Sequence, residues 1–417
     1  MDKRDPVPPR RGDLEIIETT YQGRRALVVR DSLGLIRDPV LLQGVAIELL
    51  GMLDAPRALG ELRLELVRRR GGLLEGDDGL EELVRELDSV GLLQSPAFRA
   101  RKKRLLADYQ KLDVREASHA GAAYPAEPDR LRAYLDSILE EAGGADSSVP
   151  VASPVAIVAP HIDLETARRA YARAYRALVG RQVRRVVLLG TGHTLEDGVF
   201  GLTDKDFVTP LGRVATDRAA VDRLRRAGDG CLAPSDIAHR REHSLEFELI
   251  FLQRILGPAF SLVPVLCGSV SQELARVSRA AEIPGVGGVL AAMRSLWEED
   301  RSGTLFVAGA DLSHIGPKFG HRERAVSLLP DARAHDQELL RAFTAGDASA
   351  FWAESRRVSD RYNVCGLTAL AFLLEVFPGA TGSLLDYDFW IEEETQSAVS
   401  FAAAALGAEG KGRGGGR

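Results

Sequence analysis

Long apolar runs alternate with amphipathic segments over most of this chain, from residue 119 to about residue 408. Runs such as "VAIVAP", "RRVVLLG", "FSLVPVLCG" and "TLFVAGA" have the length and composition of strands that are buried on both faces. Segments with helical periodicity stand between them, among them "YARAYRALVG" and "SLEFELIFLQRIL". Strands that alternate with helices predict an α/β domain, built as a layered open sheet with a substantial parallel component and helices on both faces.

The first part of the chain has a different pattern. The stretch "RRALVVRDSLGLI" predicts a short hairpin that turns at Asp31 to Gly34, and helical patterns follow it, starting with "PVLLQGVAIELLGMLD". A hairpin with small helices predicts a winged-helix-like α+β module, and a helical packing or dimerisation module is the alternative. The basic segment "RARKKRLLADYQKLDVREAS" predicts a helical linker. In chain order, we predict a disordered tail over 1–13, the module over 14–98, the linker over 99–118, the α/β domain over 119–408 and a disordered tail over 409–417.

Charge and composition exclude several classes of protein. The chain has 417 residues and a formal net charge of −6, which argues against binding to nucleic acid through phosphates. No apolar stretch is long enough to span a bilayer, and no apolar segment of a signal peptide follows the first residues. The 3 cysteines form no C-x-x-C pair, so a disulfide framework is not expected. We expect a cytoplasmic protein that binds neither nucleic acid nor membrane.

Three of the apolar runs lead into a histidine, although the chain has only 8 histidines. His161 follows the first run, His193 follows the second, and Asp311 and His314 follow "TLFVAGA". In an open α/β sheet, ligands bind beyond the carboxyl ends of the strands. We therefore expect these side chains to meet in one site, although ordinary turn chemistry would explain any single instance.

The residue types at these strand ends favour a metal site. Imidazole is the commonest metal ligand, and two imidazoles with an anionic group hold Fe(II) or Zn(II) while leaving positions open. The available anions are Asp311 and Cys365 of "NVCG". Cys365 precedes an apolar helical pattern, and a helix N-terminus favours the thiolate form of cysteine. Burial of Cys365 as an inert core residue is the alternative.

The stretch "AHRREHSLEFEL" allows two interpretations. On a helix, His243, Glu246 and Phe247 share one face, so His243 and Glu246 are predicted to point into one pocket. The same stretch contains His239-x-x-Glu242-His243, the H-x-x-E-H pattern of inverzincin metallopeptidases. Both histidines would then bind zinc, and Glu242 would be the general base. A zinc metallopeptidase is therefore one hypothesis, although no further carboxylate ligand can be assigned.

An ordered set of motifs resembles the Memo family, whose microbial members are often named AmmeMemoRadiSam system protein B. The motifs span 119–405 and stand in the family order. They are "HAGAAYPAEPDRL", "APHID", "LLGTGHT", "TPLGRVATD", "AHRREHSLEFEL", "DLSH" and "NVCG". The combination of "EHSLE", "TPLG" and "DLSH" is quite specific for this family.

The resemblance implies a fold similar to that of the LigB-type extradiol dioxygenases, which are non-haem iron enzymes. It also implies a single bound metal, iron(II) foremost and copper otherwise. Three residues would bind this metal: His161, His193 and Cys365. Three more would line the same pocket and act as acid/base groups: His243, Asp311 and His314.

The chain departs from the family pattern at a few positions. Gly192 precedes the second predicted ligand, where Ser is usual, and Ala310 replaces a common Ser. These departures leave the predicted ligands intact but change the lining of the pocket, and with it the substrate. His119 and His335 are expected at the surface. His239 is expected at the surface or at a helix cap.

The N-terminal module resembles the PqqD-like peptide-recognition domains through "DSLG", "LLGMLDAPRALGELRLEL" and "LVRELDSVGLL". That resemblance implies a partner peptide that binds along a strand edge. Two main functions follow for the whole chain. One is a dioxygenase-like, metal-dependent oxidoreductase that acts on a small molecule or a peptide. The other is a non-catalytic peptide- or partner-binding protein of a radical-enzyme-associated system.

Overall fold

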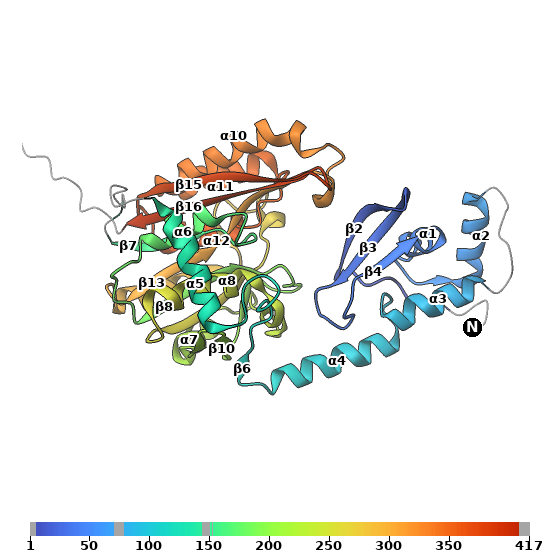
Figure 1. The fold of residues 1–417 in the computed structure, drawn as a ribbon, viewed down its shortest axis with the longest axis horizontal. Helices are drawn as coiled ribbons and strands as arrows, with labels where there is room; N and C mark the ends of the chain where they lie inside the picture. Colours follow the sequence, from blue (N-terminus) through green and yellow to red (C-terminus); the bar gives the residue numbers. More distant parts are fainter. Residues whose placement is uncertain (1–5, 71–78, 144–150, 152, 408–417) are drawn as a thin grey trace, which may run out of the picture. The chain divides into compact units, whose positions relative to one another are not determined.

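The computed structural model describes residues 6–70, 79–143, 151 and 153–407. The chain divides into two compact units, Met1–Lys111 and Leu112–Arg417, and each is described separately (Figure 1). Among the helices that the structure describes, none is both long enough and apolar enough to cross a membrane. The tail predicted over 409–417 lies outside the described residues.

The first unit combines a three-stranded antiparallel sheet with helices that cover one of its faces. Its strands are β1 (Pro6–Val7), β2 (Leu14–Tyr21), β3 (Arg24–Asp31), β4 (Val40–Gln43) and β5 (Arg57–Ala58). Its helices are α1 (Val45–Met52), α2 (Leu59–Arg69), α3 (Gly79–Val90) and α4 (Pro96–Gln110). Strand β3 lies between β2 and β4, and β1 pairs with β5. Leucines that repeat at helical spacing, such as Leu62 and Leu66, bury themselves against this sheet and form the core of the unit.

The predicted hairpin was only partly correct. The hairpin of this unit is formed by β2 and β3, which turn at residues 22–23. The predicted turn exists, because the amide of Gly34 donates to the carbonyl of Asp31 (3.0 Å). However, residues 32–36 form no strand among the described residues, since the Asp31 carboxylate accepts two backbone amides of this loop (3.0 and 2.8 Å). The return strand is β4, whose residues the sequence pattern assigned to a helix.

The segment 6–13 is ordered, although 1–13 was predicted to be disordered; residues 1–5 lie outside the described residues. Arg11 is buried and donates to the carboxylate of Asp31 (2.6 Å), and its guanidinium also lies over an aromatic ring. The prediction failed because composition reveals only that the segment is polar. It does not reveal that a distant carboxylate neutralises the arginine.

The predicted linker over 99–118 is divided between the two units. Its first part lies in α4, whose N-terminus is capped by the Ser95 hydroxyl (3.2 Å to the amide of Phe98). Its last part belongs to the second unit, where β6 (Val114–Arg115) pairs in parallel with β10 (Asp206–Thr209). Residues 114–115 are therefore part of the larger unit's fold.

The second unit is built on a mixed eight-stranded sheet. Its strands are β7 (Pro154–Ala159), β8 (Arg185–Thr191), β9 (Phe200–Leu202), β12 (Ser261–Cys267), β13 (Thr304–Gly309), β14 (Asp311–Ile315), β15 (Gly382–Glu392) and β16 (Ser397–Gly407). The order is β14-β16-β7-β13-β8-β12-β9, with β15 beside β16. The central strands β7, β13, β8 and β12 are parallel, and the others run antiparallel to their neighbours. A smaller sheet joins β6, β10 and β11 (Gly212–Val214).

Helices cover both faces of the large sheet, as the sequence pattern predicts (Figure 1). One face packs against α5 (Pro128–Leu139), α6 (Arg168–Arg176) and α8 (His243–Leu256). The other packs against α7 (Arg218–Ala227), α9 (Val286–Glu299), α10 (Ala325–Thr344), α11 (Ala348–Val358) and α12 (Leu367–Val376). The layered α/β fold is thus confirmed. Because β7, β13 and β8 are adjacent and parallel, the residues that follow them emerge at one edge of the sheet.

Candidate metal centre

Strands β7 and β13 deliver His161 and Asp311 to the same place. His161 follows β7 and is 2% exposed, and Asp311 opens β14 directly after β13 and is also 2% exposed. One Asp311 oxygen accepts the backbone amide of His161 (3.0 Å), and the other lies 3.6 Å from His161 Nε2. The carboxylate therefore holds the backbone of this histidine in place and lies beside its ring.

Strand β8 delivers His193, and the buried carboxylate of Glu242 orients it. Glu242 accepts the His193 backbone amide (3.0 Å) and lies 2.9 Å from His193 Nδ1. The same carboxylate lies 3.3 Å from His243 Nδ1 and caps helix α8 by accepting the amide of Ser244 (3.1 Å). A carboxylate on one imidazole nitrogen holds the ring in place and leaves Nε2 for a ligand.

Two glycines let the start of α8 approach the sheet closely. A Cβ on Gly309, at the end of β13, would lie 2.3 Å from the carbonyl oxygen of Ser244. A Cβ on Gly190, in β8, would lie 2.5 Å from the Ser244 hydroxyl. Any side chain at these positions would push α8 away, so the glycines allow His243 to stand beside His161 and His193.

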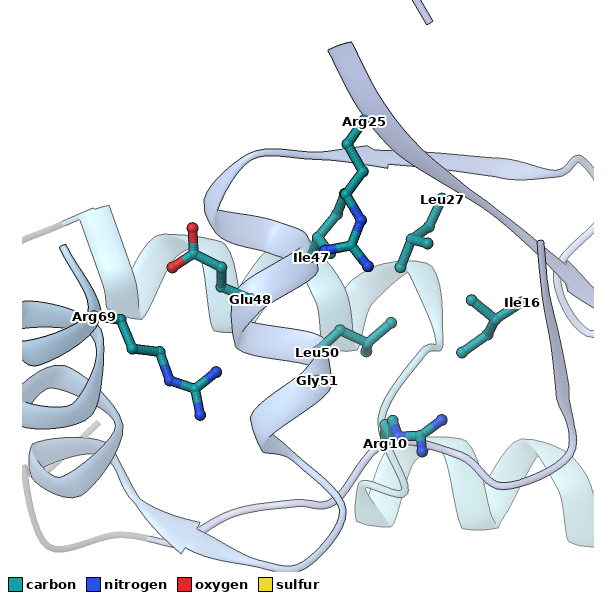
Figure 2. A pocket seen from close by; sticks show the side chains of 9 residues that line it. All are labelled: Arg10, Ile16, Arg25, Leu27, Ile47, Glu48, Leu50, Gly51 and Arg69. Carbon is teal, nitrogen blue, oxygen red and sulfur yellow. The ribbon is translucent and has the colours of Figure 1, made fainter. Parts of the chain in front are cut away.

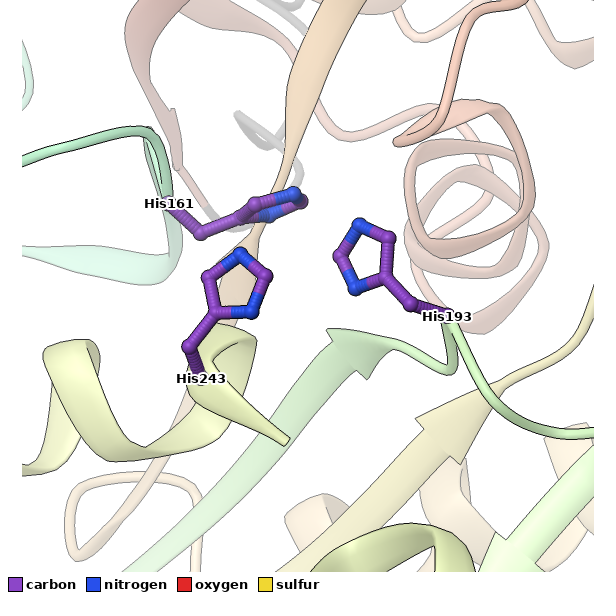
Figure 3. A group of neighbouring side chains, drawn as sticks. All are labelled: His161, His193 and His243. Carbon is purple, nitrogen blue, oxygen red and sulfur yellow. The ribbon is translucent and has the colours of Figure 1, made fainter. Parts of the chain in front are cut away.

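The three imidazoles converge, as Figure 3 shows. Ring centroids are 5.1 Å apart for His161 and His193, and 5.4 Å apart for His161 and His243. The rings of His193 and His243 stack at 4.7 Å. One nitrogen of each ring lies within 4.8 Å of the others, so these residues form a group that could hold a metal.

Cys365 belongs to a second group, which shares His161 with the first. His161, Asp311 and Cys365 offer ligand atoms within 4.8 Å of one another, and the Cys365 sulfur lies 3.4 Å from His161 Nε2. The loop before α12 carries Cys365, and the amide of Gly366 donates to the carbonyl of Asp311 (2.9 Å). The predicted trio of ligands is thus distributed over two overlapping groups, to which the predicted acid/base residues His243 and Asp311 also belong.

The pKa values of the site reflect burial and mutual charge. Burial raises the pKa of Asp311 to about 6. Burial alone would raise the pKa of the Cys365 thiol, but the neighbouring His161 and His193 lower it below its ordinary value. Burial likewise opposes protonation of His193, but the charge of Glu242 raises the pKa of His193 well above its ordinary value. The two histidines therefore shift Cys365 toward the thiolate, which is the form that binds a metal.

His314 stands beside the centre but in neither group among the described residues. Its Nδ1 lies 2.9 Å from the carbonyl oxygen of Leu312, and its backbone amide donates to the carbonyl of Tyr362 (2.7 Å). Since a carbonyl only accepts, Nδ1 carries the proton and Nε2 is the basic nitrogen of neutral His314.

The prediction that Glu246 shares a pocket with His243 was wrong. Glu246 is fully buried and pairs with Arg115 instead. It also accepts the backbone amides of Ser118 and His119 (2.9 Å each) and the hydroxyl of Tyr124. Glu246 therefore anchors the segment 114–124 on α8.

The metallopeptidase pattern is not assembled. His239 is 1% exposed, so it is neither a surface nor a cap residue, and its Nε2 lies 3.0 Å from the carbonyl oxygen of Gly201. It precedes α8 in a 3-10 turn and belongs to neither ligand group of the described residues. His335 is also buried, because its Nδ1 pairs with Glu354 (2.7 Å).

One histidine of the site was missed. His119 is half-buried, its Nε2 lies 3.0 Å from the carbonyl oxygen of Arg241, and its ring contacts His243 and Phe247 edge-on (5.8 and 5.6 Å between centroids). The signal was its place in "HAGAAYPAEPDRL", one of the motifs that carry the family resemblance. The contact could not be predicted from local sequence, because more than a hundred residues separate His119 from His243.

The donor set fits a transition metal. Imidazole nitrogens, a thiolate and a carboxylate are ligands of iron, copper and zinc, and hard cations such as Mg²⁺ prefer oxygen alone. His161 Nδ1 is buried and has no hydrogen-bond partner among the described residues. An imidazole with a buried nitrogen left over is costly without a ligand, so the residues present suit a metal.

The first unit contains a separate pocket of about 260 Å³ (Figure 2). Apolar side chains of β2, β3 and α1 line it, together with three arginines and one carboxylate. Its lining residues are Arg10, Ile16, Arg25, Leu27, Ile47, Glu48, Leu50, Gly51 and Arg69. Each arginine also pairs with a carboxylate at the surface, of which that of Glu65 is half-buried: Arg10 with Asp54 (2.8 Å), Arg25 with Glu18 (2.7 Å) and Arg69 with Glu65 (2.9 Å).

Comparison with known proteins finds similarity over both units. The model of the Memo-like protein family matches residues 115–405. A MEMO1 family protein of Aquifex aeolicus is 29% identical over 379 residues, which cover 90% of this chain and 94% of the relative. A MEMO1 family protein of Thermus thermophilus is 27% identical over 354 residues, which cover 84% of this chain and 99% of the relative. The protein memo-1 homolog of Caenorhabditis elegans is 26% identical over 272 residues, which cover 63% of this chain and 71% of the relative.

Proposed function

This chain belongs to the Memo family, and from that premise we propose that it binds one metal ion, iron(II) foremost or copper, through His161, His193 and Cys365. The observation that carries the proposal is the convergence of imidazoles, thiol and carboxylate at the ends of adjacent parallel strands. When bound, such a metal supplies redox chemistry at open coordination positions. The reaction class that fits is oxidation of a small molecule or a peptide, with dioxygen as the oxidant.

The chain's own residues would manage protons and orientation. His314 would take or give a proton at Nε2, because Nδ1 donates to the Leu312 carbonyl. Asp311 would hold His161 in place through its backbone amide. Glu242 would hold the His193 ring, so that Nε2 faces the metal.

Metal content tests the proposal directly. Protein purified without oxygen, analysed by elemental mass spectrometry, is expected to contain about one iron or copper per chain. His161→Ala should remove it, because His161 belongs to both ligand groups. His321→Ala is the matched control, since His321 Nε2 contacts the Arg361 carbonyl (2.8 Å) and lies in neither group of the described residues.

Absorption spectroscopy tests whether Cys365 is one of the metal ligands. A charge-transfer absorption from sulfur to metal is expected in the wild type and should be absent in Cys365→Ser, but present in Cys231→Ser, whose cysteine is buried elsewhere. A wild type with stoichiometric metal and no such absorption would contradict ligation by Cys365. Zinc that depends on His239 would instead favour the metallopeptidase.

We propose, as a second function, that the first unit binds a partner peptide in which acidic residues flank an apolar residue. The apolar floor and three guanidinium groups of the pocket in Figure 2 support this proposal. Exposed ion pairs contribute only about 0–1 kcal/mol each, so a peptide carboxylate can replace the present partners at little cost. Strands β2 and β4 each have one partner among the described strands, which leaves edges for an added strand.

Peptide titration followed by fluorescence anisotropy tests this second function. A labelled peptide rich in Leu and Glu should bind, and its counterpart with Lys in place of Glu should not. Arg25→Ala with Arg69→Ala should abolish binding. Arg30→Ala is the control, because Arg30 lies on the opposite face of β3 from Arg25. Equal binding of both peptides would contradict the proposed charge preference.

A further inference from the structure

We propose that His161, His193 and His243 form a three-imidazole metal face that binds a divalent transition metal without the Cys365 thiolate. The inference rests on the proposed metal function and deepens it. It assigns His243 to the metal ligands, where the sequence predicted an acid/base group. The metal class is one that imidazole suits: Zn(II), Co(II), Ni(II) or Cu(II).

The first support is the geometry of the group itself. One nitrogen of each of the three rings lies within 4.8 Å of the others, and the ligand atoms of the group that contains Cys365 also lie within this distance of one another. The rings of His193 and His243 stack nearly in parallel (17° between planes), and Nδ1 of each ring lies near the same Glu242 oxygen, so their Nε2 atoms lie on the same side. The ring of His161 stands edge-on to both (86° and 79°) and faces them (Figure 3).

The second support is Glu242, which organises two of the three rings. The same oxygen, Oε1, lies 2.9 Å from His193 Nδ1 and 3.3 Å from His243 Nδ1. The Glu242 side chain is 1% exposed, so its contacts with the two imidazoles are not shared with bulk water. With Nδ1 of both rings directed at the carboxylate, Nε2 of both rings is turned to the opposite side. A buried carboxylate behind imidazole ligands is the usual arrangement of metal sites that use histidine.

The third support is that the face does not depend on the loop that carries Cys365. His161 and His193 follow central strands of the sheet, and His243 begins a buried helix. The close approach that Gly190 and Gly309 permit holds this helix against those strands. Removing the thiol should therefore leave the three imidazoles in place. Three histidines with an open fourth position are a known zinc arrangement.

Titration of the full-length, chelator-treated protein with Co(II), followed by absorption spectroscopy and calorimetry, tests the inference. Cys365→Ser is expected to bind one Co(II) per chain with the d–d absorption of a nitrogen-ligated ion and without sulfur-to-metal charge transfer. Cys365→Ser combined with His243→Ala should bind no stoichiometric Co(II) at concentrations that saturate Cys365→Ser. His321→Ala in the same Cys365→Ser background is the matched control, since His321 Nε2 contacts the Arg361 carbonyl and His321 is in neither group of the described residues.

The outcomes separate the inference from the proposed function. If the wild type binds Co(II) through sulfur and folded Cys365→Ser binds none, the inference is wrong and the proposed function stands. If the double variant still binds as Cys365→Ser does, His243 is not a ligand and the inference is also wrong. Cys365→Ala replaces Cys365→Ser where circular dichroism shows that the latter is unfolded. A wild type that binds no Co(II), Fe(II) or Cu(II) overturns both.

Discussion

At the scale of single residues, one carboxylate determines much of the centre. Glu242 caps α8, holds His193 by backbone and ring, and contacts the ring of His243. Its pKa is well below its ordinary value, because the charges of the neighbouring histidines outweigh the effect of burial, which would raise it. The residue is therefore an anion at neutral pH and offsets positive charge at the site.

Glu242→Gln should weaken metal binding by roughly 10–100-fold, which is the usual effect of removing a carboxylate behind an imidazole ligand. The amide keeps the shape of the side chain but not its charge. Calorimetric titration with Zn(II) measures the change, and Glu116→Gln, at an exposed position, is the control. An unchanged affinity in Glu242→Gln would show that the carboxylate has only a capping role.

Glu246→Ala should destabilise the second unit by about 3–5 kcal/mol, because it leaves the buried Arg115 guanidinium without a counter-charge. Replacing both residues by apolar ones, as in Arg115→Met with Glu246→Leu, should cost less than Glu246→Ala alone. Denaturant unfolding measures both. If the double variant were less stable than Glu246→Ala, the uncompensated charge of Arg115 would not be the cause of the lost stability.

At the scale of elements, helix α8 connects the sheet with the site. It begins at the carboxyl ends of β8 and β13, and all its residues from Ser244 to Gln253 are buried. The apolar pattern of this helix is visible in the sequence. Its close contact with the sheet is visible only through the glycines beneath it.

Gly309→Ala should therefore reduce both stability and metal affinity, since its Cβ would meet the Ser244 carbonyl oxygen at 2.3 Å and displace α8. Overpacking of this kind costs about 1–3 kcal/mol. Thermal unfolding and Zn(II) titration measure the two effects. Gly51→Ala is the matched control, because its Cβ would have nothing within 4 Å and the residue is helical.

Glu248→Gln should change the pH dependence of stability. Glu248 is fully buried on α8, it contacts the Tyr175 hydroxyl, and burial raises its pKa well above its ordinary value. Since the folded state binds this proton more tightly than the unfolded state, the wild type loses stability as pH rises above about 4.5, by about 1.4 kcal/mol per pH unit until the folded pKa is reached. The Glu248→Gln variant should not lose stability in this way, because glutamine does not ionise.

Denaturant unfolding at a series of pH values checks this expectation. The difference in unfolding free energy between Glu248→Gln and the wild type should grow with pH from about 4.5 upward. The same substitution at exposed Glu116 should show no such growth. A constant difference across pH would mean that Glu248 ionises normally in the folded protein.

At the scale of the whole molecule, each unit has its own apolar core, and every residue of the two ligand groups lies in the second unit. The residues 112–118 are part of that unit, although the sequence places them in a linker. Arg115 pairs with Glu246, and the hydroxyl of Ser118 also contacts that carboxylate.

Residues 112–417, produced alone, should therefore fold and bind one metal ion per chain. A fragment that begins at 119, where the linker was predicted to end, should be markedly less stable, because Glu246 loses the Arg115 guanidinium. Circular dichroism and metal titration of both fragments test this boundary. Equal stability of the two fragments would show that segment 112–118 contributes nothing to the second unit.

The sequence by itself determined the layered α/β architecture and the location of the centre. Periodicity indicates which segments are buried strands. In a parallel sheet, the carboxyl ends of these strands lie at the same edge. His161, His193, Asp311 and Cys365 were all found in this way or through the family motifs, and they do meet. Their individual roles remain predictions for the experiments above.

Only the tertiary structure decided which polar groups pair across long separations. The Arg115–Glu246 pair spans 131 residues and the Glu242–His193 contact spans 49, and no local pattern encodes either. For the same reason the sequence placed Glu246 in the pocket, His239 near the surface and residues 112–118 in a linker. Periodicity describes one element at a time, whereas a buried charge is placed by the partner that neutralises it on another element.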